Sequence, residues 1–158
     1  MQKRVVLVTG AARGLGAAVA ARFHAAGYAV AIGDIAFDAA QALARDLSAD
    51  GSSAFALNLD VTAKAAFETA RDAILQRWGR VDALVNNAGA SKVIPVMEIT
   101  AEQFDQVINV NLRSVLFGCQ VFGQHFADAG AGPSILQVSG LTQTAGGKFF
   151  AIHLPCHQ

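Results

Sequence analysis

The hydrophobic positions of the chain alternate between short continuous runs and longer stretches of helical spacing. A continuous β-branched and aliphatic run lies at residues 5–8, and four further predominantly apolar runs lie at 28–33, 54–59, 81–85 and 134–138. Such runs are typical of strands that are buried on both faces, as they are in a parallel sheet. Between them, helical patterns cover residues 14–27, 38–49, 63–78 and 101–128. The pattern therefore predicts five strands separated by four helices.

Capping residues support the limits of the predicted helices. Gly27 follows the first helix as a C-cap, and Thr100 precedes the long helix as an N-cap, with Glu102 and Gln103 in the first turn. The glycine-rich segment 130–133, which ends in proline, interrupts that helix before the fifth strand. Strands that alternate with helices of this length predict βαβ units, and right-handed crossovers place helices on both faces of a parallel sheet.

Composition narrows the class of protein. The 158 residues are 53% hydrophobic and 15% charged, which suits one globular domain and excludes intrinsic disorder. Twelve basic and twelve acidic residues balance, which argues against a nucleic-acid partner. No apolar run approaches the roughly 20 residues of a membrane span, and the start is too short for a signal peptide. The two cysteines, Cys119 and Cys156, cannot form a disulfide framework. We therefore predict a cytoplasmic protein.

The turn between the first strand and the first helix carries a phosphate-binding pattern, with glycines at positions 10, 14 and 16. Gly10 allows a tight turn, Gly14 leaves room for a pyrophosphate, and Gly16 lets the helix pack closely. The free amides and the dipole of the helix N-terminus then face the anion. A lone glycine pattern is weak evidence, and an ordinary glycine-rich turn is the alternative, but strand and helix flank this one correctly. The absence of a Gly-Lys-Ser/Thr sequence disfavours a P-loop.

Asp34 stands at the end of the second strand, where a carboxylate accepts hydrogen bonds from the adenosine ribose of a dinucleotide. A carboxylate there would repel a 2′-phosphate, and Ile35 offers nothing to bind one, so the pattern favours NAD over NADP. Arg13 favours the opposite choice, because a cation in the turn pairs with a 2′-phosphate. A solvated residue at the strand end is the alternative interpretation of Asp34.

Five motifs together carry a family resemblance. They are the glycine turn at 9–16, Leu-Asp-Val-Thr at 59–62, Trp-Gly-Arg-Val-Asp at 78–82, Asn-Asn-Ala-Gly at 86–89 and Asn-Val-Asn-Leu at 109–112. From about residue 3 to residue 140 the chain resembles the short-chain dehydrogenase/reductase family. The resemblance implies an α/β fold of the Rossmann type: a doubly wound parallel sheet in three α/β/α layers, with about five strands in the order 3-2-1-4-5. It also implies an NAD(P)-binding domain over 1–145.

The resemblance implies a role for each matching position. Asp34 would bind the adenosine ribose, and Asp60 and the Val61 amide would border the adenine. Asn111 would support a water in the proton relay of the catalytic residues. The remaining cofactor-binding positions would surround the pyrophosphate or line the cleft, with Asn87 also tying the central strands together: Gly10, Arg13, Gly14, Leu15, Gly16, Asn87, Ala88, Gly89 and Val110.

The chain departs from the family at three catalytic positions. The family's mechanism needs a serine after the fifth strand, then a tyrosine about a dozen residues on, and a lysine four residues further that helps a phenol with a pKa of about 10 to transfer protons near neutrality. Here Gly140 takes the serine position, with Ser139 and Thr142 as neighbouring hydroxyls. His153 and His157 take the tyrosine and lysine positions, and the single tyrosine is Tyr28.

Three hypotheses account for this departure. The histidines could replace tyrosine and lysine, or His153, Cys156 and His157 could bind a metal. In the third hypothesis, which we favour over both histidine replacement and a metal site, residues 146–158 form an irregular tail outside the family sequence, because the chain is truncated or its reading frame has shifted. Back-translating residues 153–158 and starting one base later permits Tyr-x-x-x-Lys.

The sequence therefore predicts an incomplete cofactor-binding portion of an NAD-preferring oxidoreductase, with Asn111 and Ser139 as its catalytic residues. The reaction would transfer a hydride between the nicotinamide and a small alcohol or ketone, and this chain would be impaired in it. An inactive dinucleotide-binding module is the alternative. We further expect the fifth strand to be a sheet edge, a homo-oligomer formed through the helix 101–128, and no nucleic-acid or membrane partner.

Overall fold

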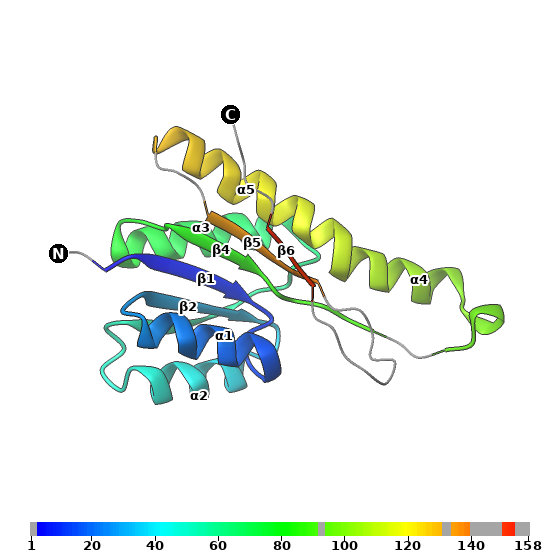
Figure 1. Ribbon diagram of the computed structural model, residues 1–158, viewed down its shortest axis with the longest axis horizontal. Coiled ribbons are helices and arrows are strands. Elements are labelled where there is room, and N and C mark those ends of the chain that lie inside the picture. The colour runs from blue at the N-terminus through cyan, green and yellow to red at the C-terminus, as the bar shows by residue number, and fades with distance from the viewer. Residues whose placement is uncertain (1–2, 92–93, 131–133, 140–149, 154–158) are drawn as a thin grey trace.

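A computed structural model describes residues 3–91, 94–130, 134–139 and 150–153 (Figure 1). In chain order the elements are β1 (Val5–Thr9), α1 (Gly14–Ala25), β2 (Ala29–Asp34), α2 (Phe37–Leu47), β3 (Ala54–Asn58), α3 (Lys64–Trp78), β4 (Ala83–Asn86), the 3-10 turn η1 (Val96–Glu98), α4 (Ala101–Ile108), the π-helical turn η2 (Asn109–Arg113), α5 (Ser114–Asp128), β5 (Ser134–Ser139) and β6 (Phe150–His153).

The strands form one sheet in the order β3-β2-β1-β4-β5-β6. The first five are parallel: Val6 of β1 pairs with Val30 of β2 on one side and with Ala83 of β4 on the other. The predicted parallel sheet and its order 3-2-1-4-5 are therefore confirmed.

The sixth strand differs from the prediction for the end of the chain. We expected residues 146–158 to be irregular and β5 to be the edge of the sheet. Instead, β6 runs antiparallel to β5, with Leu136 paired to His153 and Ser139 to Phe150. The run 149–152 is short and apolar, too short to show a period, and β5 offers it a row of unpaired backbone groups. Backbone pairing therefore defines this strand where side-chain periodicity does not.

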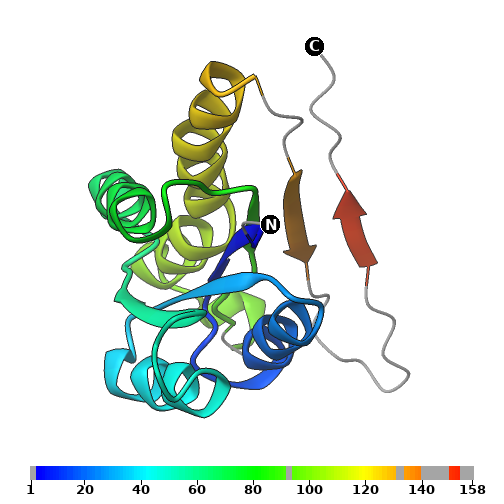
Figure 2. The ribbon, with the colours of Figure 1, turned by 90° about the vertical axis from the view of Figure 1, so that its left-hand side faces the viewer.

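Both faces of the sheet are apolar, which explains the continuous hydrophobic runs in the sequence. Along β1, Val6 and Val8 face the helices α1 and α2, together with Val30 and Ile32 of β2. The opposite face packs against α3 and α5, whose largest buried side chains are Phe67, Phe122 and Phe126. Figure 2 shows α1 and α2 on one face of the sheet and α3 and α5 on the other.

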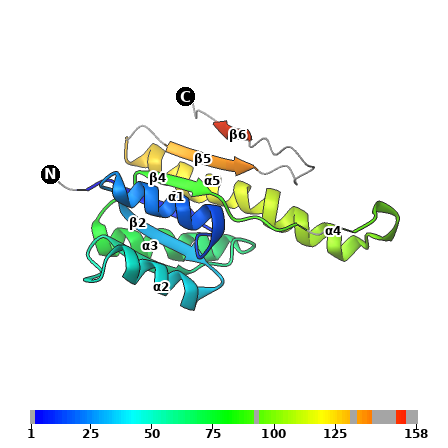
Figure 3. The ribbon, with the colours of Figure 1, turned by 60° about the horizontal axis from the view of Figure 1, so that its bottom comes forward.

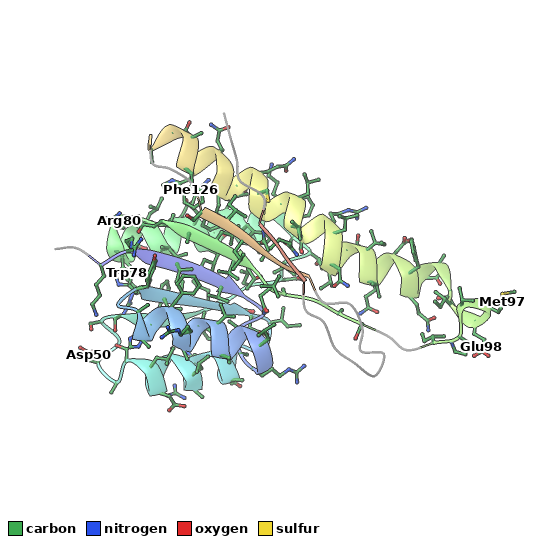
Figure 4. The ribbon with its side chains drawn as sticks, in the orientation of Figure 1. Asp50, Trp78, Arg80, Met97, Glu98 and Phe126 are labelled. Atoms are coloured by element: carbon green, nitrogen blue, oxygen red, sulfur yellow. The ribbon has the colours of Figure 1, made fainter. Side chains whose placement is uncertain are left out.

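The predicted helix 101–128 is one helical segment with a π-helical turn inside it. Thr100 caps its start as predicted: the Gln103 amide donates to Thr100 Oγ1 over 3.3 Å, and the Thr100 amide donates to Gln103 Oε1 over 3.1 Å. The α4 end projects beyond the sheet (Figure 3), and Met97 and Glu98 lie at its tip (Figure 4). Across the described ranges, no helix has the length and hydrophobicity that a bilayer crossing requires.

Candidate functional site

The predicted cofactor residues gather at one end of the sheet. Gly10, Asp34, Asp60 and Asn87 stand at or just after the carboxyl ends of β1, β2, β3 and β4. These four strands are parallel, so their carboxyl ends share one edge, on the side toward which α4 extends (Figure 1). The strand order reverses between β1 and β4, and such a switch point is where open α/β sheets bind ligands.

The three glycines of the β1–α1 turn are required for different reasons. Gly10 and Gly14 have φ values of +61° and +58°, which favour glycine. A Cβ on Gly16 would lie 2.3 Å from the Gly10 carbonyl oxygen and 2.4 Å from Asn87 Nδ2, so Gly16 packs against the turn itself. A Cβ on Gly10 would lie 2.6 Å from Ala88 Cα, whereas one on Gly14 would meet nothing within 4 Å. The turn is therefore close-packed at Gly10 and Gly16 and open at Gly14.

The open side of the turn coincides with the start of α1. This helix begins at Gly14, has Arg13 as its N-cap without a side-chain cap hydrogen bond, and has no acidic residue in its first turn. The first amides of a helix have no intrahelical acceptor, and the helix dipole adds positive potential there. The geometry therefore suits an anion such as a phosphate.

The Asp34 carboxylate lies beside this turn and is held by two backbone amides. Oδ2 accepts a hydrogen bond from the Ala12 amide, and Oδ1 accepts one from the Ala36 amide, both over 2.9 Å. Asp34 is half-buried, whereas Arg13 is exposed. Each carboxylate oxygen has a second lone pair, so Asp34 retains the capacity to accept hydrogen bonds from a ligand's hydroxyl groups.

A second group of hydrogen bonds holds the turn from the β4 side. Thr9 Oγ1 accepts from the Asn87 and Ala88 amides over 3.0 Å each and donates to the Val85 carbonyl over 3.3 Å. Asn87 Nδ2 donates to the carbonyl oxygens of Thr9 and Gly10 over 2.9 and 3.0 Å. Asn87 thus ties β4 to β1. Thr9 was not among the predicted site residues, although a polar residue that ends a buried strand directly before Gly10 was the available signal.

The predicted adenine-side residues lie close to the end of β2. The Leu59 amide donates to the Asp34 carbonyl over 3.1 Å, so the segment after β3 lies beside Asp34. Asp60 is exposed, and its Oδ1 accepts from both the amide and the hydroxyl of Thr62. Val61 is buried in the core, and Val110 packs against that core. Asp60 is therefore the side chain of this group that faces solvent.

Asn111 lies in the π-helical turn and binds the segment that follows β4. Its Oδ1 accepts from the Ala90 amide over 2.7 Å, and its Nδ2 donates to the Ala90 carbonyl over 2.8 Å. Both polar ends of the side chain are engaged, so Asn111 fastens the segment after Asn87 to the long helix. Ser139 ends β5, and β5 lies beside β4. The side chains of Ser139 and His153, and all of Gly140, Thr142, Cys156 and His157, lie outside what the structure describes.

The single tyrosine lies at the other end of the sheet. Tyr28 precedes β2, its ring centroid lies 5.1 Å from that of Phe23, and the Arg4 guanidinium stacks over it at 4.5 Å. Arg80 and Trp78, labelled in Figure 4, mark the same amino end of the strands. Tyr28 is therefore separated from Asp34 by the length of β2.

The strand order, the switch point, the glycine turn and the acid at the end of β2 together define a dinucleotide-binding α/β domain. A comparison with protein families identifies which kind. The chain belongs to the short-chain dehydrogenase family, whose model, described as "short chain dehydrogenase", matches residues 4–152. That match extends into the segment that we predicted to lie outside the family sequence.

Relatives of known name share this family. The D-threitol dehydrogenase of Mycolicibacterium smegmatis is 35% identical over 136 residues, which are 86% of this chain and 52% of that enzyme. The sorbitol dehydrogenase of Cereibacter sphaeroides is 37% identical over 136 residues, with the same coverage. The chain thus spans about half the length of these relatives.

A solved structure shows the same similarity in three dimensions. The 3-ketoacyl-(acyl-carrier-protein) reductase from Brucella melitensis, complexed with NADH, superimposes with a TM-score of 0.81 at 32% identity, covering 89% of this chain and 59% of that one.

Proposed function

We propose that the chain binds NAD at the carboxyl edge of its sheet and forms the cofactor-binding portion of an oxidoreductase. The observation that carries the proposal is the glycine turn at the switch point between β1 and β4. Asp34 is hydrogen-bonded to this turn on one side and Asn87 on the other. The turn has free space at Gly14. This arrangement matches what a pyrophosphate requires: free amides, positive potential and no side chain in the way.

Each part of the dinucleotide has candidate partners in the chain. The turn would surround the pyrophosphate with Gly10, Arg13, Gly14, Leu15 and Gly16, and Asp34 would accept hydrogen bonds from the adenosine ribose. Asp60 and the Val61 amide would border the adenine. The rest of the cleft would be lined by Asn87, Ala88, Gly89 and Val110. When bound, the nicotinamide supplies a site that accepts or donates a hydride.

The charge of Asp34 favours NAD over NADP. A 2′-phosphate would place its negative charge beside a carboxylate that two amides already hold in position. Like charges at close range cost free energy, and Arg13 is an exposed side chain whose ordering would cost conformational entropy. We therefore expect the repulsion at Asp34 to outweigh the attraction to Arg13.

The proposed reaction is hydride transfer between the cofactor and a small alcohol or ketone. The dehydrogenases of threitol and sorbitol among the relatives support a small hydroxylated substrate. Within residues 1–145, which we propose as the cofactor-binding domain, Asn111 and Ser139 are the candidate catalytic residues.

The homo-oligomer contact is proposed on the helix 101–128, where Phe104, Leu112 and Leu116 are more than half exposed. The two-cysteine composition supports a cytoplasmic location.

A dinucleotide-binding module without turnover is the second candidate function. It is favoured by the position of Tyr28, which packs against Phe23 and Arg4 at the amino end of the sheet. Because the chain has no other tyrosine, no phenol of this chain is available at the cofactor edge as a general acid.

Fluorescence titration with NADH and NADPH tests the cofactor, and a panel of small alcohols and ketones tests the reaction. We expect NADH to bind at least about tenfold more tightly than NADPH. Asp34→Ala should narrow this ratio, while Asp38→Asn, which removes a charge from the exposed first turn of α2, should leave it unchanged. Equal affinities would contradict the NAD preference, and binding of neither would contradict the proposed site. NADH binding without turnover on any member of the panel would favour the second candidate.

A further inference from the structure

The Asp34 carboxylate is hydrogen-bonded to the backbone of the phosphate-binding turn, and recognition of the ribose does not require this bond. Its Oδ2 accepts the amide hydrogen of Ala12, 22 residues earlier in the chain, over 2.9 Å. Ala12 lies inside the turn, between Gly10 and the start of α1. The backbone adds one more link between the same two elements, from the Ala11 amide to the Gly33 carbonyl over 3.3 Å. The end of β2 is thus bonded to the turn through both backbone and side chain.

Apolar packing holds the start of this part of the turn, because Ala11 is buried in the core and Ala12 packs against it. Packing ends at Gly14: the N-cap of α1 makes no side-chain hydrogen bond, and a Cβ on Gly14 would meet no atom within 4 Å. On the β4 side, Asn87 Nδ2 binds the carbonyl oxygens of Thr9 and Gly10, which precede the open part. Among the residues that the structure describes, Asp34 is the side chain whose hydrogen bond to a turn amide is nearest to Gly14.

The other carboxylate oxygen of Asp34 fixes the orientation of the group. Oδ1 accepts the Ala36 amide over 2.9 Å, so the carboxylate bridges the turn and the segment before α2. A hydrogen bond to an ionised acceptor is stronger than one between neutral groups. The plane of the carboxylate is therefore set before any ligand arrives.

We propose that Asp34 is a positioning residue in the cofactor-free protein. It holds the Ala12–Gly14 part of the turn against the end of β2, and we call this arrangement the closed turn. Recognition of the ribose and shaping of the pyrophosphate site then depend on one carboxylate. The cofactor part of this statement rests on the proposed function, but the closed turn itself does not. One consequence is that a substitution of Asp34 intended to admit a 2′-phosphate also loosens the binding site for the pyrophosphate.

Limited trypsin digestion of the cofactor-free protein tests this proposal, because Arg13 is exposed and directly follows Ala12. Mass spectrometry would follow cleavage after Arg13, with cleavage after Arg71 on α3 as the reference bond in the same digest. Cleavage of a transiently opened segment reports the population of the open form. The variants are Asp34→Ala, Asp34→Asn and Asp34→Glu, with Asp38→Asn as the matched loss of one nearby negative charge. Far-UV circular dichroism would establish that each variant is folded.

We expect Asp34→Ala to accelerate cleavage after Arg13 by about tenfold or more, the scale of a lost charge-assisted hydrogen bond. Asp34→Asn keeps one acceptor oxygen and should give a smaller increase, while Asp38→Asn should give none. Asp34→Glu keeps the charge but displaces the oxygens, so it should also accelerate cleavage. It serves as the deciding variant if Asp34→Ala does not fold.

Unchanged cleavage after Arg13 in Asp34→Ala, or in Asp34→Glu where that variant decides, would overturn the proposal. Equal acceleration after Arg71 would also overturn it, because it would indicate a general loss of stability. Protection of the wild-type Arg13 bond by NADH tests the proposed function separately. Failure of protection alone would contradict the cofactor assignment and leave the closed turn standing.

Discussion

Replacing Gly16 by alanine is expected to destabilise the folded chain, because the added Cβ would clash with closely packed atoms of the turn and of Asn87. The added Cβ would lie 2.3 Å from the Gly10 carbonyl oxygen, 2.4 Å from Asn87 Nδ2 and 2.9 Å from Ala11 Cα. Two of these atoms belong to the backbone of the turn. The remaining atom, Asn87 Nδ2, is held by two hydrogen bonds, to the Thr9 and Gly10 carbonyl oxygens. Any relaxation must therefore shift the turn or release Asn87.

The cost follows from these contacts. Inserting a methyl group into a well-packed site costs about 1–3 kcal/mol, and each hydrogen bond that Asn87 gives up costs about 1 kcal/mol. We expect a loss of about 3 kcal/mol in the free energy of unfolding. For a chain of this length that corresponds to a decrease in Tm of about 6–12 °C.

Two other glycines provide matched controls. Gly123 lies in α5, and an added Cβ there would meet nothing within 4 Å, so Gly123→Ala should stabilise the chain by about 0.5–1 kcal/mol. Gly14 has open space too, but its φ of +58° makes alanine unfavourable by about 1 kcal/mol. Urea unfolding followed by far-UV circular dichroism should therefore rank the midpoints Gly123→Ala, wild type, Gly14→Ala and Gly16→Ala, from highest to lowest. A Gly16→Ala midpoint equal to that of the wild type would refute the packing argument.

Three further outcomes can be measured. Thr9→Val removes the acceptor of the Asn87 and Ala88 amides and should lower the free energy of unfolding by about 1–3 kcal/mol, whereas Thr9→Ser should lower it less. Burial raises the pKa of Asp82, but hydrogen bonds from Arg80 and the Val5 amide lower this pKa by more than burial raises it. The resulting pKa is below the usual 3.8. A depressed pKa stabilises the fold above the unfolded pKa, and this stabilisation is lost as the pH falls through the folded value. Asp82→Asn should therefore show a smaller loss of stability than the wild type in urea unfolding between pH 7 and pH 3. Replacing Leu112 and Leu116 by glutamate should shift the proposed homo-oligomer to smaller species in sedimentation velocity, and unchanged species would argue against a contact on that helix.

The sequence was informative where each element carries its own periodicity or capping pattern. The five predominantly apolar runs predicted β1 to β5 because both faces of a parallel sheet are covered, so most positions in these strands are apolar. Thr100 and Gln103 predicted the start of α4 because a capping box depends on residues three apart. The order of the strands followed from the family resemblance and not from any local pattern.

Features that depend on contacts between distant residues could not be predicted in this way. The strand β6 is defined by its pairing with β5, and no pattern within 150–153 specifies that partner. The hydrogen bond from Ala12 to Asp34 joins residues whose closeness follows from the pairing of β1 with β2. The π-helical turn around Asn111 has no distinctive composition, since its residues also suit an α-helix.

The positions of these contacts separate cofactor binding from proton transfer within the chain. Thr9, Asp34 and Asn87 shape the turn through hydrogen bonds that lie among the first 88 residues. Asn111, the candidate for the proton relay, binds Ala90 with both ends of its side-chain amide and keeps one further acceptor site and one further donor. Tyr28, the only phenol, packs at the opposite end of the sheet. The side chains that shape the proposed dinucleotide site therefore lie at the opposite end of the sheet from Tyr28. For this reason we expect binding of NADH and turnover to be separable properties of this chain.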